Sequence, residues 1–287
     1  MNAANPAAFP QGDFSLNPQE FAKFCEFFYR KTGIVFAENK RYFVERRILE
    51  RMEASQSASF REYFAIVRFE NAGQEMQRLV NAMTVNETYF FREDYQFDAL
   101  VQGILPEVSS KKRPGQTIRI WSLPCSTGEE PYSIALYILE GWEGADEFNI
   151  EILGSDIDSR VLSEAQKGIY GERAVSRIPM AIRQKYFKPV DGNLFQISEA
   201  LRESIDFSPV NVVDTAQMRN YSNIDVIFCR NMLIYFDDLT RRQAMETMYE
   251  CLAPGGFICL GHSESMSRMS SLYRPRRIGE AIVYQKP

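Results

Sequence analysis

The sequence predicts an α/β protein in which a Rossmann-like, mainly parallel sheet with a small antiparallel insertion follows a helical domain. From residue 117 onward, short apolar segments alternate with amphipathic helical segments, the pattern of a parallel sheet covered on both faces. Residues 17–84 carry helical periodicity without a strand pattern. The chain has 287 residues, 45% hydrophobic and 25% charged, which is enough for two compact units.

The N-terminal part is expected to begin as a flexible tail, rich in Ala, Asn and Pro, and to continue as a small helical domain. The first helix starts where Asn17 can cap, Pro18 suits the first helical position and Glu20 completes a capping box; Gly33 ends it. Three more amphipathic helices are expected at about 39–54, directly after Ser59, and around 76–83. The expected division of the chain is a tail at 1–15, a helical domain at 16–84, a linker at 85–98 and a sheet domain at 99–287.

The sheet domain is expected to alternate strands and helices. The expected strands are 118–121, 150–154, 225–229, 257–261 and 281–285, and the helices between them are 131–139, 160–167 and about 239–252. Short alternating segments around the turn at 191–193 predict a small antiparallel β insertion at about 184–209, with its strands at 186–187, 194–197 and 205–207.

Charge and composition exclude several classes of protein. The 33 basic residues face 38 acidic ones, and the net charge of -5 argues against a chain-wide electrostatic grip on nucleic acid. No apolar run approaches the ~18 residues of a membrane span, so we expect a cytoplasmic protein without direct membrane insertion. The five cysteines form no C-x-x-C pair and there is one histidine, so no metal site is predicted.

The loop after the first expected strand, 122–133, contains one glycine, Gly128, followed by Glu129 and Glu130. It is neither a G-x-G-x-x-G fingerprint nor a phosphate loop, and the two carboxylates would repel a pyrophosphate. A cationic or zwitterionic ligand fits these residues better. A capped helix start with solvated glutamates fits the local sequence equally well.

Two further loops carry polar residues at expected strand ends, where an open α/β sheet binds its ligands. Asp156 ends the second strand and could hold a ribose diol, although an Asp at a strand end is more often a helix cap, a role that Asp158 fits better. The segment 228–236 follows the next apolar strand and places Asn231 and Tyr235 just beyond it.

Four separate motifs resemble the chemotaxis receptor glutamate methyltransferases of the CheR family. They occur in the family's order, at 84–93, 125–133, 228–236 and 252–264. The helical domain, sheet order and small β insertion are similar to that family from about residue 15 to 286. The resemblance implies a methyltransferase dependent on S-adenosylmethionine, which would form methyl esters on glutamate side chains of the cytoplasmic helices of chemoreceptors and release S-adenosylhomocysteine.

The resemblance also implies a set of site residues. The cofactor contacts would be Asn86, Thr88, Arg92, Glu129, Asp156, Asn211, Val212, Asn231 and Met232, with the linker contributing the first three. The family usually has Asn-Leu where this chain has Asn211-Val212. Its first loop commonly has Ala where Leu123 and Pro124 stand.

The implied chemistry needs positioning more than proton transfer. A glutamate carboxylate is already a nucleophile at neutral pH, so no general base is required. Arg92 could hold the incoming carboxylate with its planar fork, and Tyr235 could present its hydroxyl beside the methyl group; these two are the predicted catalytic residues. The alternatives from sequence alone are a linker salt bridge for Arg92 and a packing ring for Tyr235.

The expected second helix carries a local excess of positive charge. Between 40 and 51 it has five basic and two acidic residues, and Arg46, Arg47 and Arg51 are the predicted docking residues for an acidic receptor helix. A solvated, charge-laced helix is the alternative. The stretch 188–194 is short for a peptide-binding loop, so no tether to a receptor's C-terminal pentapeptide is expected.

Two other functions compete with this interpretation. A methyltransferase acting on nucleic acid bases would place an Asn-Pro-Pro-Tyr-like segment after the strand at 225–229, and none occurs there. A cofactor-binding regulatory or docking protein without catalysis would be expected to have lost the cofactor loop or Arg92, and both are retained.

Overall fold

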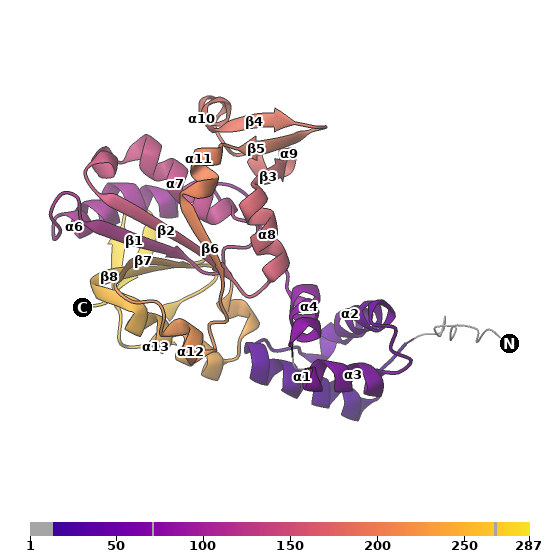
Figure 1. The fold of residues 1–287 in the computed structure, drawn as a ribbon. Helices are drawn as coiled ribbons and strands as arrows, with labels where there is room; N and C mark the ends of the chain where they lie inside the picture. The colour runs from indigo at the N-terminus through magenta and orange to yellow at the C-terminus, as the bar shows by residue number, and fades with distance from the viewer. Residues whose placement is uncertain (1–13, 71, 267–268) are drawn as a thin grey trace. The chain divides into compact units, whose positions relative to one another are not determined.

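The structure is a computed structural model that describes residues 14–70, 72–266 and 269–287. The tail predicted at 1–15 lies almost wholly outside these residues. The chain divides into two compact units, Met1–Val85 and Asn86–Pro287 (Figure 1).

In its described residues, 14–70 and 72–85, the first unit has four α-helices and a short 3-10 turn. The helices are α1 (Pro18–Thr32), α2 (Arg41–Ala54), α3 (Phe60–Phe69) and α4 (Gln74–Met83), and the turn is Glu38–Lys40. The capping box of α1 is confirmed, because Asn17 accepts from the backbone of Glu20 while the Glu20 side chain accepts from Asn17. Gly33 ends the helix with φ 74°, a conformation that glycine adopts without steric cost.

Over the residues described, the second unit is built on a seven-stranded sheet. Its strand order is β6 (Ile205–Pro209), β2 (Asn149–Asp156), β1 (Thr117–Ser122), β7 (Ile224–Cys229), β8 (Leu252–Leu260), β10 (Ala281–Gln285) and β9 (Arg274–Ile278). The strands from β6 to β8 run parallel, and β10 pairs antiparallel with both β8 and β9. The order reverses at β1, which lies between β2 and β7, so the carboxyl ends of these three strands form a topological switch point.

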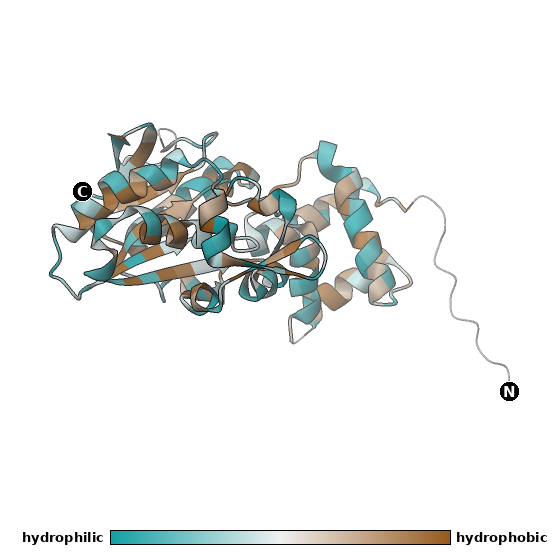
Figure 2. Cartoon of the chain, turned by 90° about the horizontal axis from the view of Figure 1, so that it is seen from above, coloured by the Kyte–Doolittle hydropathy of each residue, from teal (hydrophilic) through white to brown (hydrophobic). Residues whose placement is uncertain are grey.

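Helices cover both faces of this sheet, with α6 and α7 on one side and α12 and α13 on the other (Figure 1). The main helices are α7 (Glu129–Gly141), α8 (Ser159–Lys167), α12 (Thr215–Met218) and α13 (Asp238–Cys251). Hydrophobic and hydrophilic residues are mixed along the helices of the chain, as Figure 2 shows, which lets a helix bury its apolar side. Trp121, Tyr132 and Phe228 are fully buried in the resulting core.

A helical stretch before β1 has no counterpart among the elements predicted from sequence. It comprises α5 (Tyr95–Ala99), a π-helical turn (Leu100–Ile104) and α6 (Leu105–Ser109). Gly103 weakens the helical pattern there. A Cβ at this position would lie 2.3 Å from Cγ2 of Ile278, so packing against β9 excludes a better helix former.

The small antiparallel sheet differs from the predicted insertion. It has the order β3 (Ile169–Gly171), β5 (Leu194–Ile197) and β4 (Phe187–Val190), and short helices α9 (Glu172–Val175), α10 (Met180–Tyr186) and α11 (Glu199–Glu203) lie around it in the chain. The strand expected at 205–207 is instead β6, which pairs in parallel with β2 at the edge of the main sheet. The insertion therefore starts earlier and ends sooner than 184–209.

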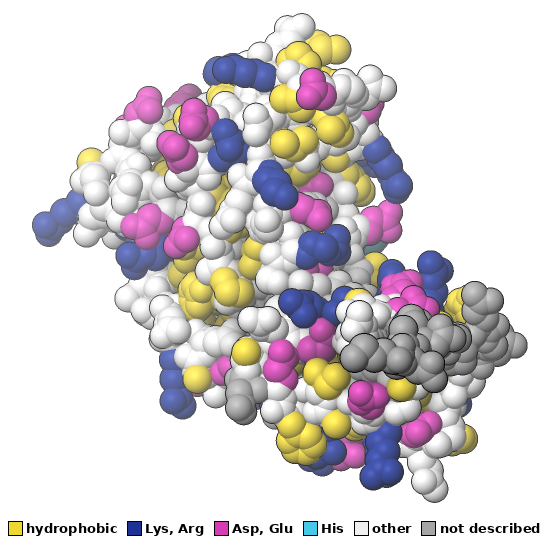
Figure 3. Space-filling view, turned by 45° about the vertical axis from the view of Figure 1, so that its right-hand side comes forward, with side chains coloured by type: hydrophobic (Ala, Val, Ile, Leu, Met, Phe, Trp, Pro, Cys, Tyr) yellow, Lys and Arg dark blue, Asp and Glu magenta, His cyan; other side chains and the backbone are white. Residues whose placement is uncertain are grey.

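Within the described ranges, none of the helices has the length and apolarity that crossing a bilayer requires. Basic and acidic side chains are interspersed over the face of the molecule drawn in Figure 3. This distribution fits the small net charge of -5.

Candidate active site at the switch point of the sheet

Asp156, at the end of β2, joins the loops that follow β1 and β2. Its Oδ2 accepts from the backbone N–H of Ser126 at 2.9 Å, and its Oδ1 accepts from that of Asp158 at 2.9 Å. The side chain is almost fully buried, and burial raises its pKa to about 6. Each carboxylate oxygen can accept a second hydrogen bond, so Asp156 retains capacity for a ligand hydroxyl.

Asp158 is the N-cap of α8, as its position in the sequence predicts. Its carboxylate accepts from the backbone N–H groups of Arg160 and Val161, which leaves Asp156 available for the ligand. Asn86 donates its side-chain amide to Asp158 Oδ2 at 2.8 Å, so the start of the linker segment lies against the loop after β2. Thr88 lies half-buried two residues further on.

Glu129 begins α7 and is 4% exposed, so it is not the solvated glutamate that the alternative interpretation assumes. Thr127 donates its hydroxyl to Glu129 at 2.6 Å, and burial raises the pKa of the carboxyl. Throughout the part of the chain that the structure describes, neither Glu129 nor Asp156 has an ion-pair partner. Buried carboxylates without a cation favour a positively charged ligand with hydroxyl donors over an anionic one.

The loop after β7 is held in an unusual conformation by Glu264, which ends the motif 252–264 but is not among the predicted site residues. Asn231 has φ 61°, in the left-handed region that few non-glycine residues adopt. The carboxylate of Glu264 accepts from the backbone N–H groups of Asn231, Leu233 and Gly261 at 2.8, 2.8 and 2.9 Å. These bonds fix the half-buried side chains of Asn231 and Met232 at the carboxyl end of the sheet.

Arg92 and Tyr235, the two predicted catalytic residues, lie within electrostatic reach of one another. Burial raises the pKa of Tyr235, while the positive charge of Arg92 lowers it. Arg92 donates to the carbonyl oxygen of Glu87 at 2.9 Å and its guanidinium lies 5.8 Å from the ring centroid of Tyr89. Among the described residues Arg92 forms no ion pair, so the salt-bridge alternative is not what the structure contains.

Asn211 and Val212 lie in the loop after β6, the strand next to β2. The side chain of Asn211 accepts from the backbone N–H of Val213 at 3.3 Å, and the backbone N–H of Asn211 donates to the side-chain oxygen of Gln217 at 2.8 Å. Val212 is 5% exposed. The loop thus has a defined backbone at the same end of the sheet as Asp156.

The three predicted docking arginines of α2 differ in their surroundings. Arg51 donates two hydrogen bonds to the buried carboxylate of Glu75, at 2.9 and 2.8 Å, and so links α2 to α4; its docking role stays a prediction. Arg46 and Arg47 share the carboxylate of Glu50, and Arg46 is 65% exposed. These two remain accessible to a partner.

A doubly wound sheet with buried carboxylates after β1 and β2 and an antiparallel final pair of strands defines the class of methyltransferases that use S-adenosylmethionine. Residues 86–281 match the family described as CheR methyltransferase, SAM binding domain, and residues 19–84 match CheR methyltransferase, all-alpha domain. The chain belongs to the CheR methyltransferase family.

Curated relatives match nearly the whole chain. Chemotaxis protein methyltransferase 2 of Vibrio cholerae is 47% identical over 93% of both chains. Chemotaxis protein methyltransferase 2 of Pseudomonas aeruginosa is 35% identical, over 98% of this chain and 99% of its own. The chemotaxis protein methyltransferase of Borreliella burgdorferi is 33% identical, over 89% and 93%.

Proposed function

We propose that this methyltransferase esterifies glutamate side chains on the cytoplasmic helices of chemoreceptors, as part of adaptation in chemotaxis. The products would be glutamate methyl esters and S-adenosylhomocysteine. The observation that carries the proposal is an arginine, Arg92, that forms no ion pair with any described residue and lies within electrostatic reach of Tyr235, at the end of the sheet where two buried carboxylates have no described cation as partner. The relatives named as chemotaxis methyltransferases support it.

The cofactor fits the donor set of this site. Asp156 would accept from the ribose hydroxyls, and Glu129 offers a carboxylate to a positively charged part of the molecule. The other residues proposed to hold it are Asn86, Thr88, Asn211, Val212, Asn231 and Met232, with Arg92 at the edge of the site. When bound, S-adenosylmethionine supplies an electrophilic methyl group on a sulfonium.

The residues of this chain would then bind, orient and desolvate the reacting carboxylate. Arg92 can receive it in a bidentate pair, which fixes the direction of attack. Tyr235 can donate its hydroxyl beside the reacting atoms. Placement of this kind supplies up to ~7 kcal/mol or more of a reaction barrier, and no group has to remove a proton because the carboxylate is already ionised.

Radiolabel transfer to a purified receptor cytoplasmic fragment tests this proposal. We expect label in the receptor that alkali releases as volatile methanol, since only carboxyl methyl esters hydrolyse so easily. A fragment in which the labelled glutamates are replaced by alanine is the control and should take up no label. Cofactor binding without transfer would favour the docking-protein alternative, and alkali-stable label would indicate another substrate.

The cell compartment and partners follow from the same proposal. The receptor helices that carry the glutamates face the cytoplasm, so we place the enzyme there. We propose no nucleic acid partner, because the surface in Figure 3 mixes both signs of charge.

A further inference from the structure

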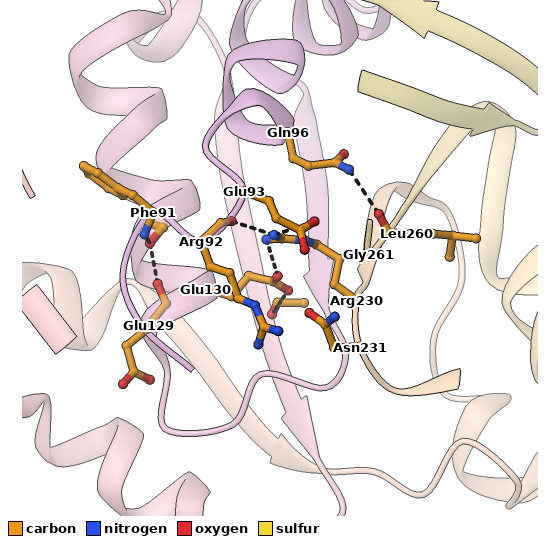
Figure 4. Close-up of polar contacts among 12 residues, drawn as sticks. Phe91, Arg92, Glu93, Gln96, Glu129, Glu130, Arg230, Asn231, Leu260 and Gly261 are labelled. Carbon is orange, nitrogen blue, oxygen red and sulfur yellow. Dashed lines mark hydrogen bonds and ion pairs between the residues drawn. The ribbon is translucent and has the colours of Figure 1, made fainter. Parts of the chain in front are cut away.

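Arg230, the first residue after β7, is a buried cation bound to two carboxylates. Its side chain is 2% exposed, with Nη1 2.9 Å from Glu130 Oε2 and Nη2 3.1 Å from Glu93 Oε2 (Figure 4). Ser122 donates to the other oxygen of Glu130 at 2.8 Å. The three charged residues come from separate parts of the chain, namely the linker, the start of α7 and the end of β7.

The same guanidinium also donates from Nη2 to the backbone carbonyl oxygen of Arg92. The residues on either side of Arg92 are strained: Phe91 has φ 60° and Glu93 has φ 55°. Non-glycine residues in the left-handed region are strained and persist only where the surroundings hold them. Arg230 binds both the backbone carbonyl of Arg92, which lies between these two residues, and the carboxylate of Glu93.

Other contacts complete this hold on the linker. The N–H of Phe91 donates to the hydroxyl of Ser133 on α7 at 3.1 Å, and the carboxylate of Glu93 accepts from the N–H of His262 at 3.2 Å. The Arg92 side chain extends away from this cluster, on the side where Asn231 lies (Figure 4). The backbone around Arg92 is thus held firmly, while its guanidinium is available to the proposed active site.

A contribution to stability does not explain why Arg230 and its two carboxylates are buried here. Removing two carboxylates and a guanidinium from water is costly, and such clusters add little net stability over apolar residues of the same size. Burial raises the pKa of Glu130, although the charge of Arg230 opposes that rise. A cluster that contributes little stability, yet binds the backbone of a proposed catalytic residue, is better explained by what it positions.

We propose that Arg230 is a positioning residue for methyl transfer, which with Glu93 and Glu130 holds Arg92 in the backbone conformation that directs its guanidinium toward Tyr235. This inference rests on the proposed role of Arg92 in binding the substrate carboxylate. Because the Arg230 side chain is 2% exposed, it would act through Arg92 and not by contact with substrate or cofactor.

A double-mutant cycle tests the proposal. Arg230→Lys keeps the charge but cannot bridge two carboxylates and a carbonyl group at once. We expect its kcat for receptor methylation to fall ~10–100-fold, with the Kd for S-adenosylhomocysteine within ~3-fold of the parent. The double variant with Arg92→Ala should be no more than ~3-fold slower than Arg92→Ala alone, because both changes remove one function.

Glu130→Gln gives the same test if Arg230→Lys does not fold. Lys112→Met is the matched control, because Lys112 lies 2.9 Å from the buried Asp225 in the same unit, at the opposite end of β7. It should lower the thermal midpoint while keeping kcat. If the ion pairs of Arg230 were merely structural, Arg230→Lys would also lower the thermal midpoint and keep kcat.

The outcomes separate this inference from the function on which it rests. A slow Arg92→Ala with a fast, folded Arg230→Lys, or rate losses that multiply in the double variant, would overturn the positioning role alone. Full turnover in Arg92→Ala would overturn the proposed role of Arg92 and this inference with it.

Discussion

At the scale of single residues, Asp156 combines a structural and a proposed ligand-binding role in one carboxylate. Burial raises its pKa from 3.8 to about 6. Between these values the folded chain holds a proton that the unfolded chain has released. Asp156 therefore stabilises the fold fully below pH ~4, and this contribution is lost as the pH rises through about 6.

Binding should show the opposite pH dependence, because ribose hydroxyls donate to the ionised carboxylate. We expect the affinity for S-adenosylhomocysteine to rise roughly tenfold between about pH 5 and about pH 7, as Asp156 loses its proton. Calorimetric titrations across this range measure the rise. Asp156→Asn cannot ionise and should bind more weakly at neutral pH without a rise, so an equal rise in that variant would assign it to another group.

Arg92 and Tyr235 are expected to affect turnover more than cofactor binding. Arg92→Ala removes the partner of the incoming carboxylate and Tyr235→Phe removes one hydroxyl, so kcat should fall ~100-fold and ~10-fold. The Kd for the cofactor should change little in Tyr235→Phe. Steady-state methylation of a receptor fragment, with calorimetry on the same variants, measures both quantities. Full turnover in Tyr235→Phe would show that its hydroxyl has no role.

The sequence indicates some site residues and conceals others for a physical reason. Asp156 and Asn231 follow apolar strands directly, so the topology of an open sheet already places them near a ligand. Arg230 and Glu264 follow apolar strands too, yet charged residues there are normally solvated. Only the folded structure shows that both are buried. Arg230 is paired with two carboxylates, and Glu264 accepts from three backbone N–H groups.

At the scale of elements, α2 presents two accessible arginines and one structural arginine. We expect Arg46→Glu with Arg47→Glu to slow receptor methylation ~10-fold at low salt and to flatten its salt dependence, because an acidic partner helix would lose two attractive charges. Arg51→Ala should instead lower the free energy of unfolding by ~2–3 kcal/mol, since it removes two hydrogen bonds from the buried Glu75 and leaves Arg78, 3.6 Å away, as the remaining cation beside it.

The matched control for the charge reversal is Arg30→Glu with Arg61→Glu, two exposed positions on α1 and α3. This pair changes the net charge equally but leaves α2 intact. Initial rates across a salt series compare the variants. Equal slowing in the control would mean that net charge, and not the surface of α2, governs the encounter with the receptor.

The turn between β4 and β5 predicts the absence of a peptide tether. Val190 pairs with Leu194, so only three residues connect the strands, with Gly192 at φ 71°. Such a tight turn offers no additional loop to contact a peptide. We expect no measurable binding of a receptor C-terminal pentapeptide by calorimetry, and no change in methylation rate when the receptor lacks it. Micromolar affinity would contradict this prediction.

Elements were predictable where periodicity and caps agree, as in α1. The prediction that 205–207 belongs to the antiparallel insertion is wrong, because a short alternating pattern does not reveal which strand it pairs with. Its true partner, β2, lies about fifty residues earlier in the chain. β3 is not predicted from the sequence because it has three residues and directly follows Gly168, which ends α8. Strand pairing depends on tertiary contacts, which a single-sequence pattern does not contain.

At the scale of the whole molecule, the proposed cofactor residues all belong to the unit Asn86–Pro287, whereas Met1–Val85 has its own apolar core around Phe24, Ile48 and Leu79. A ligand that binds only the folded state stabilises it by mass action. The stabilisation should therefore appear in the sheet unit, where the ligand contacts would be lost on unfolding.

We expect S-adenosylhomocysteine at ~100 times its Kd to stabilise the sheet unit by about 2.7 kcal/mol, which for a domain of this size raises the thermal midpoint by ~5–10 °C. Scanning calorimetry measures the shift, and hydrogen exchange locates it: protection should rise in β1, β2 and β7. Asp156→Ala at the same ligand concentration is the control and should lose most of the shift, because its weaker binding leaves the ligand nearer to its Kd. An unchanged midpoint in the parent protein would count against the proposed cofactor site, whereas a shift retained in Asp156→Ala would count against Asp156 alone.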